Sequence, residues 1–163
     1  MIVKGRVWIF GDDVDTDQIY PGKYLPLTDK AEMARHAMEG TERGEEFIAS
    51  VRQGDVIVAG KNFGCGSSRE HACVAIKGIG VPVVVARSFA RIFHRNCVNT
   101  GLAILLLDEP ERLADADIIE IDTESGKLRD LTRNETLSCR TLSSLERDIM
   151  EAGGLLAYLQ KKG

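Results

Sequence analysis

The chain lacks any apolar run close to the roughly 20 residues that a membrane-spanning helix needs, so no membrane anchor is expected. Its N-terminal stretch, Met1–Arg6, has no apolar segment of the kind found in signal peptides. Runs of basic residues are also missing, and the net charge is −4, which argues against a nucleic-acid-binding surface. These absences predict a cytoplasmic protein that binds neither membranes nor nucleic acids.

Cysteine is scarce and is not spaced for metal binding. No two of the four cysteines have CxxC spacing, so neither a zinc site nor an iron–sulfur cluster held by this chain itself is expected. In a cytosolic protein they are most simply reduced and mostly buried. Cys65 stands apart, because it lies between two glycines of a loop that we consider below.

Common ligand-binding motifs are incomplete. The position three after Gly66 is Arg69, where a dinucleotide fingerprint needs glycine, and Gly60-Lys61 is not followed by the serine or threonine of a phosphate loop. The aspartate-rich stretch 12–17 resembles a calcium loop, but it lacks the glycine and the glutamate that an EF-hand needs at its sixth and twelfth positions. We therefore expect this stretch to be a solvated turn.

The pattern of apolar residues predicts a single α/β domain over residues 1–163. Three unbroken apolar strands separated by helical segments indicate a buried, parallel βαβαβ core. The expected strands are 2–10, 55–60, 81–86, 102–107, and three short antiparallel ones at 117–122, 127–131 and 136–140. The expected helices are 30–39, 42–52, 68–79, 88–99, 142–152 and 155–161.

The glycine-rich loop 64–70 is the most informative stretch. It follows an apolar strand and opens a helix, and a helix start presents unpaired N–H groups and a partial positive charge. Together with Arg69 this favours an anion site for a carboxylate or a phosphate. The alternative is structural, because Ser67 and Glu70 also have the spacing of a capping box.

Three segments offer polar groups to one site: 15–18, 67–69 and 88–96. The last two follow strands of the parallel core, and ligands bind at the carboxyl ends of such strands. Within the last segment Arg91 and Arg95 share one helix face, which could equally be a solvated or subunit-facing surface. We assign no role to the neighbouring His94.

Ser67 can act as a base if a cation and backbone N–H groups stabilise its alkoxide. A serine nucleophile would need a histidine base with an orienting acid, and His71 has no obvious partner. Proton abstraction from a carboxylate substrate is therefore favoured over acyl transfer. The chain alone offers no Lewis acid to complete such a reaction.

Four stretches together resemble the small subunits of isopropylmalate isomerases, in the aconitase superfamily, over essentially the whole chain. They are Val14–Leu25, Gly60–Ala72, Ser88–Asn96 and Glu151–Leu159. The resemblance implies a three-layer β/β/α swivelling domain. It also implies a separate large subunit, in a heterodimer or heterotetramer, that holds a [4Fe–4S] cluster while this chain binds no cofactor.

The resemblance assigns roles as well. Ser67 would be the base, Arg69 and Ser68 would bind a substrate carboxylate, and Asp17 would orient the active-site network. The reaction would be dehydration of a small hydroxy di- or tricarboxylate followed by rehydration, as in leucine biosynthesis, where 2- and 3-isopropylmalate are interconverted.

Family members select the variable group of the substrate with a loop that matches Tyr24, Leu25, Pro26 and Leu27. Homoaconitase-like relatives often place an arginine in that loop. Residues 24–28 carry no positive charge here, and an unpaired carboxylate in an apolar pocket is costly, so isopropylmalate is expected. Citramalate, dimethylmalate and homoaconitate enzymes of the same architecture remain alternatives, as does a non-catalytic carboxylate-binding module.

Overall fold

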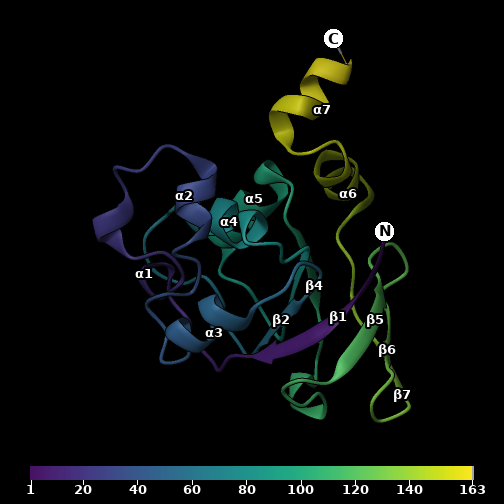
Figure 1. Cartoon of the computed structure of the whole chain (residues 1–163). Coiled ribbons are helices and arrows are strands. Elements are labelled where there is room, and N and C mark those ends of the chain that lie inside the picture. The colour runs from purple at the N-terminus through teal and green to yellow at the C-terminus, as the bar shows by residue number, and fades with distance from the viewer. Residues whose placement is uncertain (163) are drawn as a thin grey trace.

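The computed structural model describes residues 1–162 and is built on a mixed seven-stranded sheet (Figure 1). The strand order is β4-β3-β2-β1-β5-β6-β7. The first four strands along the chain are mutually parallel, and β5, β6 and β7 add to β1 as antiparallel neighbours. The strands are β1 Ile2–Ile9, β2 Val56–Ala59, β3 Val83–Ala86, β4 Ala103–Leu106, β5 Ile118–Asp122, β6 Lys127–Asp130 and β7 Glu135–Ser138.

The two central parallel strands are buried along their whole length. Every residue of β2 and β3 is buried. Since alternate side chains point to opposite faces, both faces of the sheet must be covered here. Ile57 and Val84 belong to a core that includes residues of the helices, whereas Val58 and Val85 belong to a second core shared with the antiparallel strands. Coverage on both faces explains why these strands are continuous apolar runs in the sequence.

The antiparallel half of the sheet folds over one face of the parallel half. Ile119, Ile121 and Leu128 lie in the same core as Val58. An antiparallel bridge between Leu106 and Arg140 brings the segment after β7 back to the far edge strand β4. The predicted three-layer β/β/α arrangement is therefore confirmed: antiparallel strands, parallel strands, then helices.

Several helices begin later than the sequence predicts. We expected starts at residues 68 and 88, but α4 is Glu70–Gly78 and α5 is Arg91–Thr100. The residues before α5 remain extended because Ser88 and Ala90 form backbone hydrogen bonds with Phe63, whereas α4 is preceded by Arg69 in an extended conformation. The other helices on this side are α1 Thr16–Ile19, α2 Lys30–Ala34 and α3 Gly44–Ser50, with a 3₁₀ turn at Gly22–Tyr24.

The chain ends in two short helices, α6 Ser144–Glu151 and α7 Leu155–Lys162. Ser143 and Glu146 form a capping box at the start of α6, and Oε2 of Glu146 lies 2.6 Å from Nε2 of His94 on α5. This contact holds α6 against the helical layer, while α7 projects beyond it (Figure 1). No helix within residues 1–162 is long and apolar enough to span a membrane.

Candidate active site

The polar segments that the sequence analysis placed in one site are neighbours in the structure. Beyond the strands, Asp15 bridges Cys65 and Phe63 bridges Phe89, both in parallel orientation. The backbone N–H of Thr16 donates to the carbonyl of Cys65 at 2.8 Å. The extensions of β1, β2 and β3 therefore lie side by side at the carboxyl edge of the parallel sheet, where ligands bind in folds of this kind.

The stretch before α1 differs from the solvated turn that we predicted. Asp15 caps α1 by accepting a hydrogen bond from the N–H of Gln18 at 2.8 Å, and the Gln18 side chain accepts from the N–H of Asp15 at 2.9 Å. The cap fixes the direction in which α1 leaves the sheet. The acidic sequence is explained by this capping box and by Asp12, whose carboxylate accepts from the N–H of Lys61 at 2.8 Å.

Two glycines allow the loop at 64–69 to lie tightly against α5. Gly64 has φ of +85°, and a Cβ atom there would be only 2.1 Å from Cγ of Phe93. Gly66 has φ of +95°, also in the left-handed region that favours glycine. A side chain at Gly64 would push the loop away from α5 and displace the serines that follow.

The two serines are exposed, and they do not cap the helix. The N-cap of α4 is Arg69, with extended backbone and no side-chain capping bond, so the capping-box alternative for Ser67 and Glu70 is wrong for this structure. Ser68 Oγ accepts a long hydrogen bond of 3.4 Å from Nδ2 of Asn96 on α5. Within the part of the chain that the structure describes, the Ser67 hydroxyl has no hydrogen-bond partner, which leaves it available to a ligand.

Arg69 is held in place by two acceptors. Its Nη1 donates to Oδ1 of Asp17 at 2.8 Å and to the carbonyl oxygen of Tyr20 at 3.0 Å. The hydrogen bond from Arg69 and a second one from the N–H of Gly22 lower the pKa of Asp17 below its usual value, so Asp17 is a carboxylate at neutral pH. Only one guanidinium nitrogen is used in these contacts, so the rest of the group can bind an anion.

The loop that we expect to contact the variable group of the substrate begins near Arg69. Gly22 shares the Asp17 carboxylate with Arg69 and starts the 3₁₀ turn that carries Tyr24. Leu25 is 39% exposed and Pro26 is exposed as well, whereas Leu27 packs against the helical core. The apolar surface that the loop offers to a ligand therefore comes from residues 25 and 26.

Sequence reasoning missed the residues that support this loop. Tyr20 is fully buried and donates from its hydroxyl to the carbonyl of Tyr24 at 2.6 Å, and the His36 ring stacks on Tyr24. The hydrogen bond between Asn96 and Ser68 is likewise not predicted by any local pattern. No general sequence motif predicts these contacts. The spacing of four residues between Tyr20 and Tyr24 was the one sequence feature that indicated a contact between them.

Arg91 and Arg95 are exposed on α5, and within the described residues neither forms an ion pair.

Cys65 is half-buried, while Cys73, Cys97 and Cys139 are buried and reduced. No group of three or more histidine, cysteine, aspartate or glutamate side chains within residues 1–162 could hold a metal ion.

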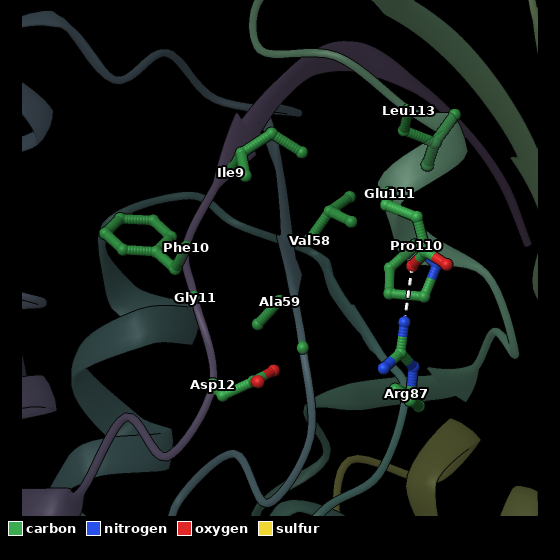
Figure 2. Close-up of a pocket in the computed structure, with 11 residues that line it drawn as sticks. Ile9, Phe10, Gly11, Asp12, Val58, Ala59, Arg87, Pro110, Glu111 and Leu113 are labelled. Carbon is green, nitrogen blue, oxygen red and sulfur yellow. Dashed lines mark hydrogen bonds and ion pairs between the residues drawn. The ribbon is translucent and has the colours of Figure 1, made fainter.

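A separate hollow of about 270 Å³ opens between β1, β2 and the 3₁₀ turn Pro110–Arg112 (Figure 2). Ile9, Val58 and Leu113 form its apolar wall, as Figure 2 shows. At its mouth Arg87 donates to the carboxylate of Glu111. Among the residues that line the hollow, Arg87 is the one cation, whereas Asp12 and Glu111 are both carboxylates, so the lining has a net negative charge that disfavours a carboxylate ligand.

Three comparisons with known proteins agree with this geometry. Residues 9–110 match the model of the aconitase C-terminal domain. The chain is 52% identical to the methanogen homoaconitase small subunit of Methanocaldococcus jannaschii, covering 99% of this chain and 94% of that one. It is 50% identical to a 3-isopropylmalate dehydratase small subunit of a Hydrogenobaculum species, covering 99% and 98%.

A solved structure described as 3-isopropylmalate dehydratase of Methanocaldococcus jannaschii superimposes with a TM-score of 0.94. It is 51% identical in sequence, and the match covers 99% of this chain and 95% of that one.

Proposed function

The chain belongs to the aconitase C-terminal domain family, and we propose that it is the small subunit of a 3-isopropylmalate dehydratase that acts in leucine biosynthesis. It is a subunit of a heteromeric, aconitase-type hydro-lyase. The reaction interconverts 2- and 3-isopropylmalate by removing water and adding it back with the hydrogen and the hydroxyl exchanged. A cytoplasmic location is part of this proposal.

The large subunit is the proposed source of the chemistry that this chain does not offer. A [4Fe–4S] cluster held by that subunit would supply the Lewis acid that assists departure of the hydroxyl group. The thiols of this chain do not fit a cluster, because Cys73, Cys97 and Cys139 are buried. The carboxyl edge of the parallel sheet, with Ser67 and Arg69, would face the partner so that the two halves of the site meet.

Ser67 is the proposed base. It is exposed, lies just before α4, and is two residues from the Arg69 guanidinium, so positive charge and unpaired N–H groups are available to stabilise its alkoxide. Ser67 would take the proton from the substrate carbon while the hydroxyl leaves the neighbouring carbon, which gives the unsaturated acid. In the second half of the cycle the same hydroxyl returns the proton to the other carbon.

Arg69 is the proposed carboxylate-binding residue, with Ser68 beside it. Its position is set by Asp17 and Tyr20, so it is oriented before the substrate arrives and little conformational entropy is lost on binding. Asp17 acts through Arg69 and orients it. It stays charged because the hydrogen bond from Arg69 lowers its pKa.

The observation that carries the substrate assignment is the exposed, apolar pair Leu25 and Pro26, a few residues after Gly22, whose N–H binds the same Asp17 carboxylate as Arg69. An isopropyl group fits such a surface, whereas the distal carboxylate of homocitrate would lose its hydration without gaining a partner. Lys23, just outside the loop, is the nearby cation that favours a second carboxylate, and its ammonium lies 5.2 Å from the centroid of the Tyr24 ring. Homoaconitase activity is the second candidate, since one relative at 52% identity carries that name.

The test is an anaerobic assay of the chain co-purified with the large subunit encoded by its own organism. Isopropylmalate, citramalate and homocitrate are each supplied, and the unsaturated acid is followed by its absorbance. The chain alone and the large subunit alone are the matched controls. We expect activity only in the complex, with the highest kcat/KM for isopropylmalate.

Other outcomes separate the alternatives. Highest kcat/KM on homocitrate or citramalate in the complex would keep the reaction and overturn the substrate. A chain that binds isopropylmalate but no large subunit would be a carboxylate-binding module. Hydrolysis of esters by the isolated chain, with Ser67 labelled by a phosphonate, would instead indicate a serine hydrolase.

A further inference from the structure

We propose that His36, which is outside the site, positions Tyr24 and thereby sets how well the enzyme distinguishes the variable group of its substrate. This inference rests on the proposed function, because the substrate-selecting loop is the element that His36 supports. His36 is therefore a positioning residue, not a catalytic one.

The ring of His36 lies flat on the ring of Tyr24. Their centroids are 3.5 Å apart and the planes are inclined by 13°. On the backbone side, the carbonyl of Tyr24 accepts hydrogen bonds from the Tyr20 hydroxyl at 2.6 Å and from the N–H of Leu27 at 3.1 Å. Tyr24 is therefore fixed both through its ring and through its backbone.

Glu39 holds the histidine in this orientation. Its Oε1 lies 3.0 Å from Nδ1 of His36, and both side chains are only about a quarter to a third exposed, at 24% and 32%. The same carboxylate lies beside the Tyr24 hydroxyl and, through that hydrogen bond, raises the pKa of Tyr24. Although partial burial opposes it, hydrogen bonds from His36 and Tyr24 lower the pKa of Glu39. Glu39 therefore holds His36, and the His36 ring in turn lies on Tyr24.

The next residues along the chain have much weaker support. Leu25 and Pro26 are exposed, and the backbone N–H of Leu25 bonds only within its own turn, to the carbonyl of Gly22 at 3.1 Å. The position of Leu25 is therefore set by what holds residues 22 and 24. Gly22 is fixed to Asp17, and through it to Arg69, while Tyr24 is fixed by His36 and Tyr20.

This arrangement relates His36 to substrate choice. Under the proposed function, a substrate bound by its carboxylate to Arg69 extends its variable group toward Leu25. Loss of the stacked ring would allow Tyr24, and with it Leu25, to shift relative to Arg69. The apolar contact would weaken while Ser67 and Arg69 stay in place, so selectivity and KM would change more than kcat.

The experiment compares His36→Ala and His36→Phe in the complex with the large subunit. For His36→Ala we expect KM for isopropylmalate to rise about tenfold, kcat to change less than about twofold, and the preference over citramalate to fall. His36→Phe keeps an aromatic ring against Tyr24 and should restore most of the preference. Arg35→Ala, at an exposed neighbouring position, is the control and should behave as the wild type.

A second measurement does not depend on turnover. Hydrogen exchange of the amides of Leu25 and Leu27 in the complex should accelerate in His36→Ala and return towards the wild-type rate in His36→Phe. Unchanged exchange, or an equal loss of kcat for every substrate with unchanged preference, would overturn the role of His36. A wild-type complex without activity on any of the acids would instead overturn the proposed function, and the exchange measurement would still decide the role of His36.

Discussion

The Nη1 atom of Arg69 lies 2.8 Å from Oδ1 of Asp17, although 52 residues of chain separate the two side chains. Asp17 also accepts from the N–H of Gly22, so one carboxylate links the guanidinium at the start of α4 to the loop that carries Leu25. A substrate carboxylate approaching Arg69 must share the guanidinium with Asp17. Replacing Arg69 should therefore change how strongly the substrate binds.

Replacing Arg69 by lysine should weaken substrate binding. Lysine keeps the charge, but it is shorter and ends in one nitrogen, so it cannot keep the contacts with Asp17 and Tyr20 and also present a second nitrogen to a substrate carboxylate. We expect KM for isopropylmalate to rise about 10- to 100-fold, measured by steady-state kinetics of the complex. Arg129→Lys, at an exposed position on β6, is the control. An unchanged KM in Arg69→Lys would remove Arg69 from the carboxylate site.

Replacing Ser67 by alanine should abolish most turnover without affecting assembly. A positioned base contributes about 10²- to 10⁴-fold to rate, so kcat should fall by that order. Because Ser67 is exposed and does not cap α4, the variant should co-elute with the large subunit as the wild type does. Ser50→Ala, at another exposed serine, should leave kcat unchanged. Near wild-type turnover in Ser67→Ala would exclude Ser67 as the base.

Introducing a cation into the substrate-selecting loop should change the preferred acid. Leu25→Arg or Pro26→Arg would give the distal carboxylate of homocitrate a partner, and leaving such a carboxylate unpaired costs several kcal/mol. We expect kcat/KM for homocitrate relative to isopropylmalate to rise at least about tenfold. Leu25→Gln and Pro26→Gln, polar but uncharged, are the matched controls. The same ratio in the arginine and glutamine variants would mean that this loop does not contact the variable group.

The thiols should differ sharply in reactivity. Burial raises the pKa of Cys139 to about 12, and it raises the pKa of the buried Cys97 as well. Cys65 is only half-buried, although partial burial and nearby aspartates raise its pKa too.

We therefore expect a thiol reagent to modify about one cysteine per folded chain, with a rate that still increases between about pH 7 and 9 as more thiolate forms. Cys65→Ser should eliminate this reaction. Modification of several cysteines at the rate seen in the unfolded chain would contradict the structure.

Asp55 should be important for folding and not for the site. Its Oδ2 accepts hydrogen bonds from Nε1 of Trp8 and from the N–H of Arg52, each at 2.9 Å, and it pairs with Arg6. Asp55→Ala would leave these donors without their acceptor, and we expect a loss of about 3 kcal/mol in the free energy of unfolding. Urea titration measures it, with the exposed Asp148→Ala as control. A change below about 0.5 kcal/mol would show that the donors find other acceptors.

The parts of the fold that the sequence predicts are those that depend on local pattern. Strands β2 and β3 are continuous apolar runs because both faces of the sheet are covered, so their positions could be read with errors of one or two residues. The starts of α4 and α5 were wrong by two and three residues: backbone pairing of Ser88 and Ala90 with Phe63 keeps the residues before α5 extended, and Arg69 before α4 has extended backbone. Backbone pairing between strand ends joins residues about 25 to 50 positions apart, such as Phe63 with Phe89 and Asp15 with Cys65. A local sequence pattern cannot predict pairing over such separations.

The sequence by itself determined the parallel core, the glycine loop and the identity of the polar groups at the carboxyl edge of the sheet, because periodicity and glycine positions are local properties. Only the tertiary structure decided that Asp17 pairs with Arg69, that Ser67 is not a helix cap, and that His36 stacks on Tyr24. Each of these depends on the distance and orientation between side chains on different elements. Such geometry is set by packing of the whole core, which residue types and spacing along the chain do not specify.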